Sequence, residues 1–225
     1  STNSGSGVIT LAGTGGGSGS SNIGVELSNS SITSTGAAII QVTGTGAGGS
    51  NDIKIATGTN SIGGTSAAGD VLLNGTTGGG MVLGAGGDTT TVQTTGNITL
   101  NQTGGGISQG SGSLLANGLR LIGSGAFSLN QASNNINVLV ADLTGGATTL
   151  SYRDANGFSI GTGAGGLTTV QTAGSAADTT YGVTVGSATT AANTLTLNAY
   201  GAVTQATAAD NVIAGGLQLL GSGPY

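Results

Sequence analysis

The stretch Ile40-Gln-Val-Thr-Gly-Thr-Gly46 contains the pattern that decides the fold: two apolar residues on either side of a polar one, then a turn rich in glycine and threonine. The same pattern starts at Ile9 and at Val71, so it returns at a step of 31 residues. Apolar residues at every second position are typical of a strand that buries one face. The recurrence therefore predicts a short strand that occupies an equivalent place in each repeat.

Two further apolar series have nearly the same period and lie between the members of the first. Pairs with a step of 28 residues occur at Val25-x-Leu27, Ile53-x-Ile55 and Met81-x-Leu83. Single residues with a step of 30 occur at Ile32, Ile62 and Val92. Three apolar positions that return in the same order are the sequence signature of a solenoid. We predict an all-β fold, a parallel β-helix (β-solenoid) with three short strands per coil of roughly 20–31 residues and right-handed crossovers.

The composition excludes several other classes of protein. With 48 glycines among 225 residues, glycine recurs along the whole chain, which disfavours helices. The regular spacing of Val, Ile and Leu, within a hydrophobic fraction of 36%, disfavours disorder. Only Lys54, Arg120 and Arg153 are cationic, so there is no basic patch for nucleic acid. The apolar runs are too short to insert into a membrane.

A longer recurrence appears in the second part of the chain. Leu114–Phe127 aligns with Val212–Tyr225 at an offset of 98 residues, and shorter motifs upstream align at offsets of 96 and 97. We interpret residues 1–89 as coils of about 30 residues and residues 90–225 as one complete and one partial copy of a super-repeat of about 97 residues. The whole chain, 1–225, is predicted to be one continuous β-solenoid segment of a larger protein.

Residues between the apolar positions of a strand should point to solvent. Glu26, Lys54, Gln41 and Arg120 occupy such outward positions. Glu26 and Lys54 hold equivalent places one coil apart. Parallel stacking should therefore bring their side chains together, about 4.8 Å apart in the hydrogen-bonding direction.

The titratable residues do not form a recognisable catalytic or metal site. The chain has no histidine and no cysteine, and most of its acidic residues are isolated at strand starts or turns. These residues are Glu26, Asp52, Asp70, Asp88, Asp142, Asp154, Asp178 and Asp210. Asp154-Ala-Asn-Gly157 is similar to the start of a calcium loop but lacks its later ligands, so we interpret it as a corner. We expect no catalytic residue, no metal and no cofactor.

Exposed aromatic side chains are the expected platforms for a glycan. The chain has four tyrosines and two phenylalanines: Phe127, Tyr152, Phe158, Tyr181, Tyr200 and Tyr225. Phe127 and Phe158 occupy inward phases of their strands, which favours a place in the core. Tyr181 and Tyr200 are the residues whose removal would test an alternative function, that of a carbohydrate-binding or polysaccharide-cleaving β-helix protein.

Four stretches of the chain carry a resemblance to a known family: Ile9–Gly17, Ser31–Gly36, Leu150–Gly161 and Leu195–Gln205. They resemble the repeat regions of filamentous-haemagglutinin-like proteins, which are very large bacterial surface exoproteins built from β-strand repeats. The resemblance implies a right-handed parallel β-helix, export across a Gram-negative outer membrane by a two-partner or autotransporter route, and an adhesive or filament-forming role.

We therefore expect a structural segment of an extracellular bacterial fibre or adhesin stalk, not an enzyme. Leu72 and Val82 are apolar residues at outward positions, and they suit lateral packing into surface filaments. The expected partners are other copies of the chain, neighbouring coils of the same long chain, and glycans of a host or neighbouring cell. We expect no nucleic-acid partner, no membrane insertion of this segment, and a location at the bacterial cell surface.

Overall fold

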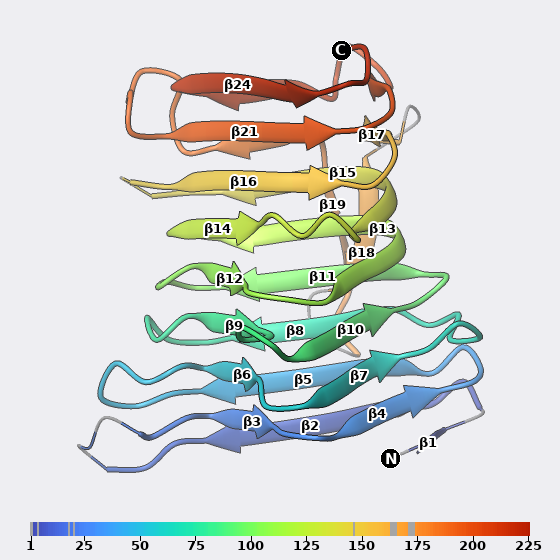
Figure 1. Ribbon diagram of the computed structural model, residues 1–225, viewed down its shortest axis with the longest axis vertical. Helices are drawn as coiled ribbons and strands as arrows, with labels where there is room; N and C mark the ends of the chain where they lie inside the picture. Colours follow the sequence, from blue (N-terminus) through green and yellow to red (C-terminus); the bar gives the residue numbers. More distant parts are fainter. Residues whose placement is uncertain are drawn as a thin grey trace.

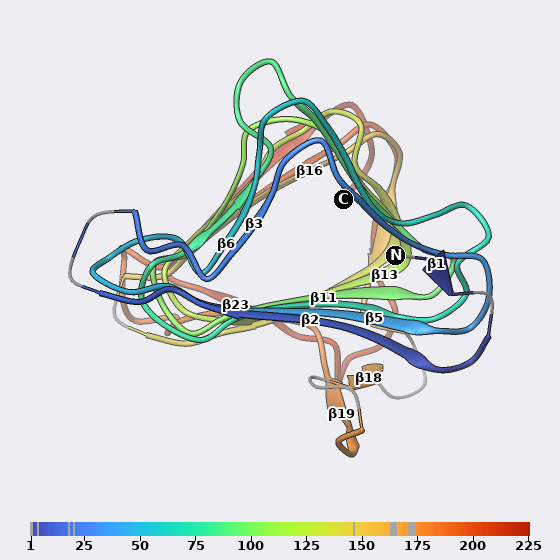
Figure 2. The same cartoon turned by 90° about the horizontal axis from the view of Figure 1, so that it is seen from below.

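The computed structural model describes residues 2–3, 5–17, 19, 21–145, 147–162, 166–170 and 174–225, and within these ranges the chain forms strands and no helix. The strands stack along one long axis (Figure 1). Viewed along that axis, they surround a triangular interior (Figure 2). Because the described part of the chain contains no helix, it contains none long and apolar enough to cross a membrane.

An eight-stranded sheet, here called sheet B, forms one side of the stack. Its strands are β3 (Val25–Leu27), β6 (Ile53–Ile55), β9 (Met81–Leu83), β12 (Ile107–Gln109), β14 (Ala126–Leu129), β16 (Thr149–Asp154), β21 (Thr194–Ala199) and β24 (Gly216–Gly221). Neighbouring strands of sheet B are paired in parallel throughout.

A fourteen-stranded sheet forms the other two sides, as two arms that join at the long strands β13 (Ser113–Gly123) and β15 (Asn135–Leu143). Arm A contains β2 (Val8–Thr14), β5 (Ile39–Thr45), β8 (Val71–Gly75), β11 (Asn97–Gln102), β20 (Val183–Val185) and β23 (Val212–Ala214). Arm C contains β1 (Thr2–Asn3), β4 (Ser31–Ser34), β7 (Thr59–Gly63) and β10 (Thr89–Gln93). Beyond the join, β17 (Phe158–Ile160) pairs with Val138 and Leu139 of β15, and β22 (Val203–Gln205) pairs with β17.

The strand register confirms the three apolar series. In arm A, Ile40 pairs with both Ile9 and Val71. The corresponding residues of the other two series pair in sheet B as Val25–Ile53–Met81 and in arm C as Ile32–Ile62–Val92. The prediction of an all-β fold with parallel strands, compatible with a β-helix, is therefore confirmed.

Glycine in the repeated Thr-Gly turn is required by a close approach between arm A and sheet B. A Cβ atom on Gly44 would lie 1.9 Å from the carbonyl oxygen of Asp52, and one on Gly13 would lie 2.0 Å from that of Gly24. Side chains cannot fit at such distances. The glycines of the sequence repeat therefore mark the corners at which the chain turns from one side of the stack to the next.

The length of the coils changes along the stack. Paired residues of arm A are 31 positions apart at Ile40 and Val71 but 20 positions apart at Leu119 and Leu139. The shorter steps coincide with β13 and β15, each of which passes from arm C to arm A as one strand without an intervening loop. Similar sequences consequently lie in different sheets: Ile98 is in arm A, whereas Leu195, its counterpart in the long recurrence, is in sheet B.

The core fills the interior of the stack and consists of the alternate residues of the strands. Phe127 and Phe158 are both buried there, which confirms their inward phase. Tyr152 is buried as well and meets Phe158 edge to face, with ring centroids 5.4 Å apart. Tyr152 is therefore a core residue and offers no exposed platform for a sugar.

We predict that Phe127→Ala, at a side chain only 1% exposed, destabilises the protein by about 3–5 kcal/mol because it leaves a cavity in a packed interior. Tyr200→Ala, at a side chain 53% exposed, should change the free energy of unfolding by less than about 1 kcal/mol. Urea unfolding followed by circular dichroism measures both. Equal effects of the two substitutions would contradict the placement of the core.

Candidate functional site

Among the residues that the structure describes, the chain leaves the stacked sheets between Ile160 of β17 and Val183 of β20. In this excursion β18 (Leu167–Val170) and β19 (Ala177–Thr180) pair in antiparallel fashion, with Leu167 opposite Thr180. This hairpin, β18–β19, lies outside arm A (Figures 1 and 2). The sequence predicted only parallel solenoid strands here, and that expectation is wrong for these residues, because the two strands pair with each other and with no solenoid strand.

Arg120 fastens the hairpin to arm A. Its Nε donates to the Thr180 hydroxyl at 2.7 Å, and its Nη1 donates to the Thr169 hydroxyl at 3.0 Å and to the carbonyl oxygens of Thr169 and Asp178 at 3.2 and 3.1 Å. Its Nη2 forms an ion pair with the Asp178 carboxylate at 2.6 Å. The sequence predicted a solvent-facing Arg120. The side chain does point away from the core, but it is 1% exposed because the hairpin covers it.

Arg120 belongs to a column of outward residues on arm A that are all buried. In register order the column consists of Gln41, Leu72, Thr99, Arg120 and Val140. Thr99 bonds the hairpin directly, with its hydroxyl 3.0 Å from that of Thr169. Leu72 is 0% exposed, so the expectation that it is available for lateral packing is wrong. Val82, on sheet B, remains partly exposed.

Several acidic residues are engaged in the corners of the stack. Asp52 is buried and accepts from the backbone N–H groups of Gly46 and Thr77 at 2.7 and 3.0 Å, from the Thr77 hydroxyl, and from Gln102 Nε2 at 2.7 Å. Asp88 accepts from the N–H groups of Thr57 and Gly58, and these bonds lower the pKa of its carboxyl. Such bonds hold one coil against the next.

The stretch Asp154–Gly157 is a corner. Asp154 is buried and accepts from the Tyr152 hydroxyl at 2.7 Å and from the N–H groups of Ile136 and Asn156 at 3.1 and 2.9 Å. Its oxygens are thus taken up by the protein itself. Among the described residues, no three His, Cys, Asp or Glu side chains lie close enough together to hold a metal ion.

Glu26 and Lys54 form the ion pair that the repeat predicted. They are register partners of β3 and β6, and their side chains meet at 2.7 Å. Both side chains are partly exposed, so the pair contributes at most about 1 kcal/mol to stability. Its main significance is that it marks the register of sheet B.

A polar groove lies beside the hairpin, where it meets arm A. Its volume is about 340 Å³, and it is lined by Ala141 and Asp142 of β15, Asp178, Thr179 and Thr180 of β19, Tyr181, and Thr184 of β20. Asp142 and Thr184 are register partners on adjacent strands. Tyr181 is 53% exposed. The groove thus combines one exposed aromatic ring with carboxylates and hydroxyls.

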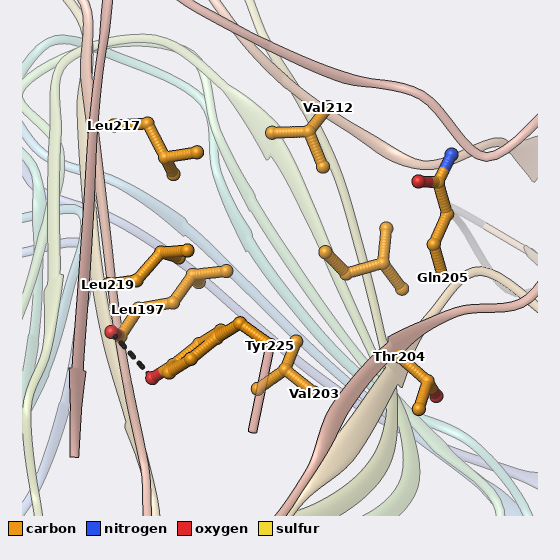
Figure 3. Close-up of a pocket in the computed structure, with 9 residues that line it drawn as sticks. Leu197, Val203, Thr204, Gln205, Val212, Leu217, Leu219 and Tyr225 are labelled. Carbon is orange, nitrogen blue, oxygen red and sulfur yellow. Dashed lines mark hydrogen bonds between the residues drawn. The ribbon is translucent and has the colours of Figure 1, made fainter. Parts of the chain in front are cut away.

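An apolar cavity of about 210 Å³ opens at the end of the stack that contains β24. Figure 3 shows Leu197, Val203, Val212, Leu217 and Leu219 directed into it, with the ring of Tyr225 beside them. The Tyr225 hydroxyl donates to the carbonyl oxygen of Leu197 at 3.1 Å. Because these apolar residues prolong the columns of the core, the cavity is a continuation of the solenoid interior.

Tyr200 lies on the outside of the stack, next to Arg153 of β16. Its hydroxyl accepts from Arg153 Nη2 at 2.7 Å, and the guanidinium carbon lies 5.2 Å from the ring centroid. One face of the ring is therefore taken by the guanidinium. Of the two tyrosines that the sequence singled out, only Tyr181 lines a groove with carboxylates.

Comparison with models of protein families, with curated proteins and with solved structures finds no match for this chain.

We predict that Arg120→Met detaches the hairpin while the stacked sheets remain folded. The substitution removes five bonds between arm A and the hairpin, which should cost about 3 kcal/mol locally and accelerate amide exchange in β18 and β19 about a hundredfold. Hydrogen exchange followed by mass spectrometry resolves the two regions. Arg153→Met, on sheet B, is the matched control and should leave the hairpin unchanged. Unaltered exchange in Arg120→Met would contradict the anchoring role.

A second prediction concerns pH. Burial raises the pKa of the Asp154 carboxyl, against the opposing effect of its hydrogen bonds. Because the folded state binds this proton more tightly than the unfolded state, lowering the pH through the raised pKa stabilises the wild type until the unfolded carboxyl is also protonated.

Asp154→Asn removes this titration. We therefore expect the stability of the wild type, relative to Asp154→Asn, to increase as the pH falls from 7 towards about 4. The measurement is the urea midpoint of both proteins across that range. A difference that shrinks on acidification would show that the hydrogen bonds of Asp154 outweigh its burial.

Proposed function

We propose that this chain is a structural segment of an extracellular bacterial fibre or adhesin stalk, in which a β-helix forms a stiff rod. The observation that carries the proposal is the stacking of parallel strands along one axis from β2 to β24, apart from one hairpin on the outside. We further propose that the helix is right-handed with three strands per coil. The repeated order of arm A, sheet B and arm C along the chain supports three strands, and the general preference for right-handed crossovers supports the hand.

The mechanism is mechanical. Each coil advances the rod by about 4.8 Å, and every coil is hydrogen-bonded to both neighbours, so bending would strain many backbone bonds at once. The corners add side-chain bonds between coils, such as those of Asp52 and Asp88. A rod of this kind can hold another module away from the cell surface, and the family resemblance supports a location outside the outer membrane.

The positions of the three cationic side chains argue against nucleic acid as a partner. Arg120 is buried, Lys54 is paired with Glu26, and Arg153 lies against Tyr200. All three cations are therefore engaged within the chain, and none contributes to a basic face that could neutralise phosphates. We propose other copies of the chain, neighbouring coils and cell-surface glycans as partners. Lateral contact between copies would use sheet B, where Val82 is partly exposed.

Electron microscopy of the full-length protein tests the proposal. We expect elongated particles whose width matches one triangular coil and whose length grows when residues 1–225 are duplicated in tandem. Protease treatment of intact cells should remove the segment if it lies at the cell surface. Compact particles of unchanged length after duplication would contradict the rod.

A further inference from the structure

We propose that the polar groove beside the hairpin is a binding site for a neutral sugar, with Tyr181 as the stacking platform and Asp142 and Asp178 as hydrogen-bond acceptors for sugar hydroxyls. This inference goes beyond the rod, because it concerns a ligand held at one place on its side. The groove is built by residues from three strands, β15, β19 and β20, and by Tyr181, which directly follows β19.

The chemistry of the groove suits a ring that has both apolar faces and hydroxyl groups. Tyr181 offers an exposed aromatic face, against which the C–H groups of a pyranose can pack. Around it stand the carboxylates of Asp142 and Asp178 and the hydroxyls of Thr179 and Thr184. Carboxylates accept and threonines both accept and donate hydrogen bonds, which matches the mixed donors and acceptors of a sugar.

The charges of the groove select against anionic ligands. The nearest cation is Arg120, which is buried, makes five bonds to the hairpin, and is already paired with Asp178. Lys54 and Arg153 both lie on sheet B, away from the groove. A phosphate, sulfate or uronate would therefore meet the carboxylate of Asp142 without a compensating cation. A neutral sugar meets no such penalty.

The size and rigidity of the groove fit a small ligand. Its volume, about 340 Å³, lies near the lower end of the range of roughly 300–1,000 Å³ that is common for ligand pockets, which suits one or two sugar rings. Asp178 is held in place by Arg120 at 2.6 Å and by the N–H of Thr179 at 2.9 Å. Positioning of this kind reduces the ordering cost of binding.

The position of the groove in the chain supports the same inference. In repeat proteins, insertions that break the period are commonly placed on the binding face. Here the hairpin is the excursion that forms one side of the groove, and the buried Arg120 holds it in a defined orientation. A buried arginine that makes five bonds to the excursion is more than a merely tolerated loop would need.

Titration of the chain with sugars, followed by NMR, tests the proposal. The probes are the methyl glycosides of glucose, galactose, mannose and N-acetylglucosamine and the corresponding β-linked disaccharides. We expect at least one to bind with a Kd of about 1 mM or lower. Tyr181→Ala should weaken that binding about tenfold or more, and Asp142→Asn should weaken it severalfold. Tyr200→Ala, at an equally exposed tyrosine outside the groove, is the matched control and should bind as the wild type does.

Several results would overturn the site. They are the failure of every probe to bind up to about 10 mM, binding that survives Tyr181→Ala, and binding that is lost in Tyr200→Ala. Preferential binding of a cationic probe, N-acetyl-lysine methylamide, with an affinity that falls steeply with added salt, would assign the groove to basic peptides instead. Hydrogen exchange of the hairpin in Tyr181→Ala verifies that the groove is intact. None of these results tests the elongated shape of the protein. The proposal of a sugar site and the proposal of a rod can therefore be contradicted independently of each other.

Discussion

The structure depends on the parallel register between equivalent strands of successive coils, in which each interior side chain lies over its counterpart one coil away. Ile9, Ile40 and Val71 form one such line in arm A. A slip of one residue would turn every interior side chain of a strand to the outside, so the apolar alternation holds the register firmly. The corners must then bring the chain to the next side of the stack at a set position. That is why Gly13 and Gly44 stand where a Cβ atom would collide with the neighbouring backbone.

The need to keep the register fixes the strands but leaves the corners between them free to vary in length. The step between paired residues can fall from 31 to 20 along arm A because β13 and β15 turn a corner without a loop, while the pairing above and below continues. Each coil contacts only its neighbours, so a change in one corner is not transmitted along the rod. The same independence allows the hairpin to be inserted between β17 and β20 without disturbing either strand's pairing with the coil before it.

The sequence was sufficient to predict the features that follow from periodicity. The three apolar series, the inward phase of Phe127 and Phe158, and the Glu26–Lys54 pair all depend on neighbours one or two positions away or one coil away. The burial of Leu72 and Arg120 could not be predicted in this way, because alternation indicates only which residues point away from the core. For Arg120, whether the outward side chain meets solvent depends on the hairpin, 49–60 residues later in the chain, which folds back over it. The sequence of that segment contains no Asn-Gly pair, which is the usual sequence signal of a tight hairpin turn.

The role of Arg120 explains why the hairpin can form a defined site. Apolar contact alone, as between Leu167 and the backbone near Gly118, would attract the hairpin to arm A but would allow it to slide or rotate. The guanidinium bonds both strands of the hairpin, through Thr169 on β18 and through Asp178 and Thr180 on β19. A planar group with several donors at set angles admits one arrangement of these partners. Since Tyr181 directly follows Thr180, the arginine that orients the hairpin also sets the position of the exposed ring in the groove.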